Sequence, residues 1–164
     1  MTNLTYKILD SLTPTQIANL LELQSNVTMV PATGVRRRIG VNGINNLSVY
    51  SYSRYLTWTS AQRKIFSDNY PTNADSKAFI KWFVEFPADT GFLDRLETWK
   101  DDKSPSWYTC YNIRGAGSIT LNGVDMTIPV GQGITYPLSI PHEMKSSSTS
   151  ALWACVVTMD NVWA

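Results

Sequence analysis

The segment from residue 106 to residue 160 constrains the fold most, because short apolar stretches alternate there with polar residues and turns. Asn122 and Gly123 separate two of these stretches, and both residue types tolerate the positive φ angles of a tight hairpin turn. Short strands at this spacing are typical of a β-sandwich or a barrel. The strands that we expect lie at residues 107–113, 118–121, 124–128, 134–136, 143–146 and 152–159.

Residues 1–100 instead mix helix and strand signals. Thr13 is a helix cap, Pro14 suits the first helical position, and Gln16 completes a capping box. This pattern predicts a helix that begins at Pro14. Further helices are expected at residues 59–66, 74–86 and 89–99, and strands at residues 6–10, 27–30 and 46–53.

The helix expected at residues 74–86 depends on Phe79, Trp82 and Phe83, which recur at helical spacing. A chain of 164 residues predicts one domain over residues 1–164. We therefore expect an α+β fold in which a mixed layer over residues 1–100 packs on a β half over residues 106–160.

Charge and apolar patterning argue against two classes of partner. The net charge is +1, so the chain lacks the basic excess of most nucleic-acid-binding proteins. We interpret the arginine run at residues 36–38 as a solvated loop or an edge strand. The chain shows neither a signal-peptide pattern nor an apolar run that could span a membrane, which predicts a cytoplasmic or virion protein. Cys110 and Cys155 are expected to be buried free thiols.

The segment RGAGSITLNGVDMTIPVGQGITYPLSIPHEM, residues 114–144, resembles the second motif of the cupin family. Gly131, Pro137 and His142 fall on the motif's Gly, Pro and His, whereas Ser139 and Ser146 replace its second Gly and its Asn. The resemblance implies a double-stranded β-helix, or jelly roll, for the C-terminal half. It also implies that His142, the single histidine of the chain, lies where cupins bind a metal.

The motif that supplies most metal ligands in cupins is absent. Tyr108 takes the place of its Glu, and its histidine positions fall on residues between 101 and 104 that are not histidines. Metal binding needs several convergent ligands. We therefore expect no metal and no cofactor; if a metal binds, His142 would hold it with Asp102, or else with Asp101 or Glu143.

The first segment, YKILDSLTPTQIANLLELQ, resembles the strand and helix that open the iron- and 2-oxoglutarate-dependent oxygenases, which share the jelly roll. In that family His142 corresponds to the distal iron ligand. The chain has one histidine, so it cannot supply the His-x-Asp/Glu pair that completes the iron site. In that family a basic residue after the distal histidine anchors oxoglutarate. At that spacing this chain has Leu152 and Trp153, so the resemblance predicts an inactive site.

Three interpretations of His142 stay open: a hydrogen-bonded residue at the barrel mouth, a contact to a small ligand or partner, or a metal ligand. If Tyr108 points into the barrel, Cys110 does as well. We take His142, Tyr108, Tyr136 and Trp153 as candidate ligand-binding residues. The interior that they line is either a packed core or a pocket for a planar or sugar-like ligand.

The leading hypothesis is a non-catalytic jelly-roll module that binds protein partners or self-associates. A structural component of a virus is its nearest analogy, drawn from the fold alone. The alternatives are a divergent metal-dependent cupin or oxygenase-like enzyme, and a cupin that binds a small ligand. The missing metal ligands argue against the enzyme.

Overall fold

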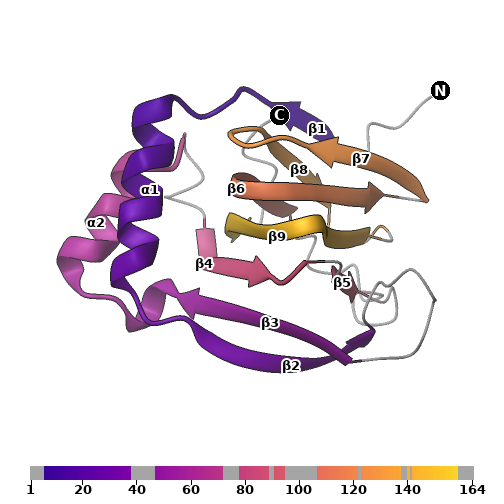
Figure 1. Cartoon of the computed structure of the whole chain (residues 1–164). Helices are drawn as coiled ribbons and strands as arrows, with labels where there is room; N and C mark the ends of the chain where they lie inside the picture. Colours follow the sequence, from indigo (N-terminus) through magenta and orange to yellow (C-terminus); the bar gives the residue numbers. More distant parts are fainter. Residues whose placement is uncertain are drawn as a thin grey trace.

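The computed structural model in Figure 1 describes residues 6–37, 47–71, 78–88, 91–94, 107–121, 123–137, 140 and 142–158. Neither helix in these ranges is long and apolar enough to cross a membrane. In chain order the elements are β1 (Lys7–Leu9), α1 (Pro14–Asn26), β2 (Val30–Arg37), β3 (Leu47–Arg54), a 3-10 turn η1 (Tyr55–Thr57), α2 (Ser60–Asn69), β4 (Ala78–Phe86), β5 (Gly91–Asp94), β6 (Trp107–Leu121), β7 (Val124–Ile128), β8 (Gly133–Pro137) and β9 (His142–Thr158).

Both helices begin at a capping box, in which two side chains satisfy backbone N–H groups that the helix leaves unpaired. The backbone N–H of Gln16 donates to Thr13 Oγ1 at 3.1 Å, and the N–H of Thr13 donates to Gln16 Oε1 at 2.8 Å. Thr59 and Gln62 repeat this exchange at the start of α2. The predicted start of α1 and the helix expected at residues 59–66 are confirmed.

All strands pair antiparallel, and two long ones, β6 and β9, run through two layers of sheet. The main layer has the order β1-β8-β6-β9-β4-β3-β2, with β2 at the opposite end from β1 (Figure 1). Here residues 107–115 of β6 face residues 151–158 of β9. The second layer contains β7, residues 117–121 of β6, residues 142–146 of β9, and β5. The two layers are therefore joined through continuous strands.

A close backbone approach marks the bend between the layers. The register of β6 against β9 shifts between Asn112 and Arg114 and again between Gly115 and Gly117. Gly115 has a φ of 91°, and a Cβ atom there would lie 1.8 Å from the carbonyl oxygen of Ser150. Only glycine fits this conformation and this gap.

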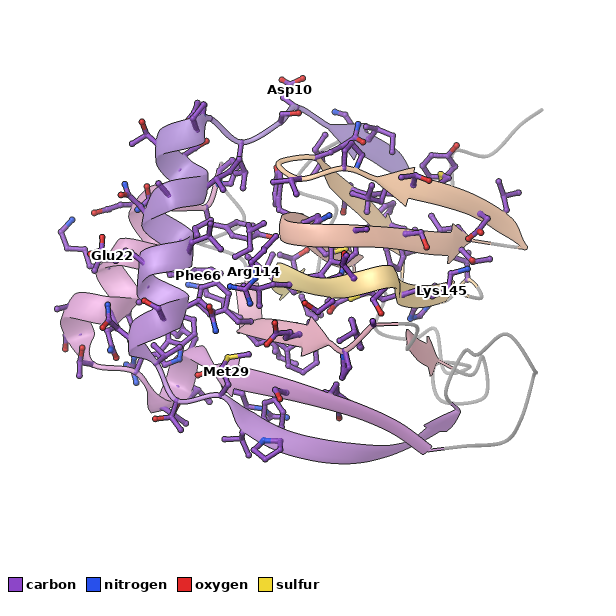
Figure 2. All side chains as sticks on the ribbon, viewed as in Figure 1. Asp10, Glu22, Met29, Phe66, Arg114 and Lys145 are labelled. Atoms are coloured by element: carbon purple, nitrogen blue, oxygen red, sulfur yellow. The ribbon has the colours of Figure 1, made fainter. Side chains whose placement is uncertain are left out.

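The main layer has a hydrophobic core on each face. On one face Leu20 of α1 and Phe66 of α2 pack against Phe83, Tyr111 and further strand residues. Figure 2 shows Phe66 between the helices and the sheet. The other face, which we call the inner face, packs against the second layer, because its core contains residues from both parts of β6 and β9.

The helix predicted at residues 74–86 is wrong where the structure describes it, because residues 78–86 form β4. This strand pairs with β3 and β9. Phe83 faces the helices, whereas Trp82 and Val84 face the inner core. Strand pairing on both sides outweighed the helical spacing of the aromatic residues, since β-propensity depends strongly on such tertiary contacts.

The helix predicted at residues 89–99 is also wrong in its described part, which is β5, a strand paired with β9. Of the strand predicted at residues 27–30, only Val30 lies in a strand, where it begins β2. Val27 instead caps the C-terminus of α1. Two pairs of short predicted strands, 107–113 with 118–121 and 143–146 with 152–159, are the continuous strands β6 and β9. Arg36 and Arg37 lie in β2 at the end of the main layer, as expected for an edge strand.

Candidate functional site

His142 lies at the start of β9 and is buried, with 6% of the residue exposed. Its Nδ1 atom is 2.8 Å from the carbonyl oxygen of Ile140. A carbonyl oxygen only accepts hydrogen bonds, so this contact requires the proton on Nδ1. The imidazole centroid lies 5.2 Å from that of the Tyr136 ring at an interplanar angle of 48°. The main chain and an aromatic ring therefore fix the orientation of the imidazole.

A row of aromatic side chains leads from His142 across the inner face. Tyr136 of β8 and Tyr108 of β6 are directly paired, and their rings meet edge to face at 5.7 Å. Trp82 of β4 continues the row, because its Nε1 donates to the Tyr108 hydroxyl at 3.1 Å. Edge-to-face contacts of this kind stabilise a core beyond the area that they bury.

Two thiols lie beside this row. Cys110 and Cys155 are directly opposite on β6 and β9, are fully buried and form no disulfide, which confirms the prediction of buried free thiols. Burial, and after it the hydrogen bond with Cys155, raises the pKa of Cys110 well above its usual value. Burial, and then the neighbouring Cys155, likewise raises the pKa of Tyr108. Cys110 and Tyr108 are therefore held in their neutral forms.

Trp153 also belongs to the inner core and is fully buried. Its ring lies over Gly117 of β6, where a Cβ atom would be 2.4 Å from Trp153 Cζ2. The absence of a side chain at Gly117 therefore makes room for the indole. Within the described ranges the Nε1 of Trp153 has no hydrogen-bond partner.

No protein-family model and no curated protein matches this sequence. Solved structures do match. A 2OG-Fe(II) oxygenase-family oxidoreductase from Burkholderia pseudomallei gives a TM-score of 0.59 at 12% identity, covering 96% of this chain and 86% of that one. A prolyl-4-hydroxylase from Pseudomonas putida gives 0.54 at 12% identity, with 96% and 94% covered. A cupin 2 conserved barrel protein from Rhodopseudomonas palustris gives 0.52 at 13% identity, with 83% and 74% covered.

The chain has the cupin and oxygenase-like jelly-roll fold. The expected α+β architecture, a jelly roll with N-terminal helices packed on it, is therefore confirmed. At identities of 12% and 13%, these matches show that the chain shares the fold of these proteins, and they do not show that it shares their activity.

Among the side chains that the structure describes, those around His142 in this jelly roll do not fit the metal that the fold family implies. The described part of the chain has no group of three His, Cys, Asp or Glu side chains that could hold a metal ion. The ring of Tyr136 packs beside the imidazole, and Tyr108, which the cupin motif predicts at the position of its Glu, is held as a neutral phenol. Asp101 and Asp102 lie outside the described residues, and so does the side chain of Glu143.

The two positions predicted for the oxoglutarate anchor, Leu152 and Trp153, project from opposite faces of β9 because side chains alternate along a strand. Leu152 faces the core under the helices, whereas Trp153 faces the inner core, and both are fully buried. Neither supplies the cation that binds oxoglutarate in the oxygenases. The hydroxyl of Ser146 donates to the carbonyl oxygen of Pro87.

The structure brings His142, Tyr136 and Tyr108 together and places Trp153 in the same core. The sequence prediction does not include Trp82 among the candidate residues, because helical spacing places residues 74–86 in a helix. A period of two was present in Ile80, Trp82, Val84 and Phe86, and this period would have placed the indole on the inner face.

Proposed function

We propose that this chain is a non-catalytic jelly-roll module that acts by binding a partner. The shortage of metal ligands around His142 carries the proposal, because the described residues contain no group of three His, Cys, Asp or Glu side chains that could hold a metal ion, and the ring of Tyr136 packs against the imidazole. A catalytic metal needs at least three protein ligands in most sites of this chemistry. The hydrogen bond from Nδ1 to a carbonyl group orients the imidazole and leaves Nε2 as its acceptor nitrogen, so the missing companion ligands among the described residues, rather than this bond, favour a structural role for His142.

Other chemistry on the inner face is also poorly supported. The thiolate is the reactive form of cysteine, and the raised pKa of Cys110 disfavours it. The fold itself does not decide the question, because its neighbours include proteins described as an oxidoreductase, a hydroxylase and a conserved barrel protein. The divergent enzyme is therefore the alternative that an experiment has to separate.

The outside of the molecule offers features for a protein partner or for self-association. Leu56 is 75% exposed and Val124 is 57% exposed. Within the described ranges β7 pairs only with β6, so its outer edge presents backbone groups that a strand of another chain could pair with. A role in a virus particle would be one example, and it rests on analogy alone.

Metal analysis and size measurement test this proposal. We expect purified protein to contain no stoichiometric iron, manganese or zinc, and to form oligomers or capture a protein partner. His142→Asn keeps a donor near the position of Nδ1 and removes Nε2, whereas His142→Ala removes both. If the imidazole is structural, the Asn variant is more stable than the Ala variant. Stoichiometric metal in the wild type that both variants lose would overturn the proposal, as would a strictly monomeric protein without a partner.

A further inference from the structure

A second cluster of side chains lies on the inner face, on strands β2, β3 and β4. Val30 is directly opposite Tyr52, and Arg54 is directly opposite Trp82, so the members of each pair project from the same face. Tyr52 and Arg54, two residues apart on β3, share this face as well. Val30 is 44% exposed, and both aromatic residues are only partly buried. Unlike the core around His142, this cluster is accessible.

Arg54 differs from the other arginines whose side chains the structure describes. Arg114 forms an ion pair with Glu85 at 2.7 Å, and Arg63 donates to the backbone carbonyls of Tyr55 and Leu56. Arg54 is exposed and makes no ion pair with any described residue. Its guanidinium carbon instead lies 5.8 Å from the centroid of the Tyr52 ring.

This position prepares the guanidinium group for an anion. An arginine that contacts an aromatic ring without an acidic partner keeps N–H groups available, in a planar fork that matches a carboxylate or a phosphate. The ring also restricts the side chain before a ligand arrives, so less conformational freedom is lost on binding.

Trp82 supplies an aromatic surface beside the cation. Its Nε1 donates to the hydroxyl of Tyr108 at 3.1 Å, and the two rings meet edge to face at 6.4 Å. These contacts hold the indole to the buried row, while part of the residue stays exposed. A flat ligand could therefore stack on a ring that is already fixed.

We propose that Arg54, Tyr52 and Trp82 form a binding site for a small planar organic anion, namely an aromatic carboxylate. The guanidinium group pairs with the carboxylate, and the two rings contact the flat part of the ligand. Positive charge without a described acidic neighbour, next to two accessible aromatic rings, favours this ligand over a neutral sugar. The site goes beyond the proposed function and does not depend on whether His142 takes part in metal binding.

Calorimetric titration with 1-naphthoate tests the site in the whole protein. We expect Arg54→Gln to weaken binding by about tenfold or more, since a charge-assisted bidentate pair is lost. Tyr52→Leu weakens binding as well, whereas Tyr52→Phe, which keeps the ring, retains it. Lys64→Gln is the matched control for charge, because Lys64 lies on α2 with 75% of its side chain exposed, and binding should not change.

Two further measurements make the result decisive. The neutral amide 1-naphthamide should bind about tenfold more weakly than 1-naphthoate. The indole N–H signal of Trp82, assigned in an NMR spectrum with a Trp82→Phe variant, should shift on titration. No binding of naphthoate at millimolar concentration, equal binding by Arg54→Gln and wild type, or equal binding of the amide would each overturn the site. The metal analysis above is independent of all three outcomes.

Discussion

Replacing Gly117 by Ala tests whether fixed side chains fill the inner face. A Cβ atom at Gly117 would lie 2.4 Å from Cζ2 of Trp153 and 3.1 Å from its Cε2 and Cη2 atoms. Carbon atoms in good contact are about 3.5–4.0 Å apart, so the indole would have to move by about 1 Å. Because Trp153 is fully buried, this movement displaces its neighbours in the inner core.

We expect Gly117→Ala to lower the free energy of unfolding by about 1–2 kcal/mol. An extra methyl group in a packed core costs about 1–3 kcal/mol. The reduced freedom of the unfolded chain offsets about 0.4–1 kcal/mol of this cost, since Gly117 does not need a positive φ. For a protein of this size the melting temperature should fall by about 2–8 °C.

Urea unfolding followed by circular dichroism measures the effect in four proteins: the wild type, Gly117→Ala, Trp153→Phe and the double variant. Trp153→Phe removes the ring atoms that face Gly117. If their contact causes the loss, Gly117→Ala should cost at least about 1 kcal/mol less in the Trp153→Phe variant than in the wild type. An unchanged midpoint for Gly117→Ala, or equal costs in both backgrounds, would refute the reasoning and show that the inner face has room to spare.

Three further predictions concern other parts of the fold. Cys110 and Cys155 should not react with Ellman's reagent at about pH 8, near the ordinary thiol pKa, until the protein is unfolded. Both thiols are buried, and the pKa of Cys110 is raised. Rapid reaction of the native protein would contradict this prediction. Tyr70→Phe should lower the free energy of unfolding by about 1 kcal/mol, because the Tyr70 hydroxyl lies 3.1 Å and 3.3 Å from two backbone carbonyl oxygens, and an unchanged urea midpoint would exclude that contribution. The hydrogen bond from Lys145 lowers the pKa of Asp125, so its stabilising effect is present above the ordinary value of 3.8 and is lost as the pH falls through the lowered value. Lys145→Gln should raise the pKa of Asp125 in an NMR titration, and an unchanged pKa would count against the pairing.

Local signals were enough to predict the helix at Pro14 and the hairpin around Gly123. Both depend on neighbouring residues, namely a capping box and a turn with a positive φ at Gly123. The failure at residues 78–86 has the opposite cause. Trp82 lies on a strand because β3 and β9 pair with it from either side, and such partners, distant in sequence, are not visible in the segment itself.

The candidate site could be predicted in part for the same reason. The resemblance to the cupin motif predicted that Tyr108 faces the interior with His142, and Tyr136 was among the candidate residues that the structure places beside the imidazole. The contact from Trp82 and the accessible cluster at Arg54 depend on the order of strands in the main layer. That order is set by the packing of the whole sheet, so no single segment carries it.

Because β6 and β9 run through both layers, they also determine how the protein unfolds. Neither layer can separate while these two strands remain paired, so we expect cooperative unfolding without a stable half-molecule. The residues that pair between β6 and β9 are far apart in the sequence, for example residues 110 and 155. These strands must pair before either layer can form. Such a topology folds slowly, and newly made chains will expose strand edges for longer than helical proteins of equal length.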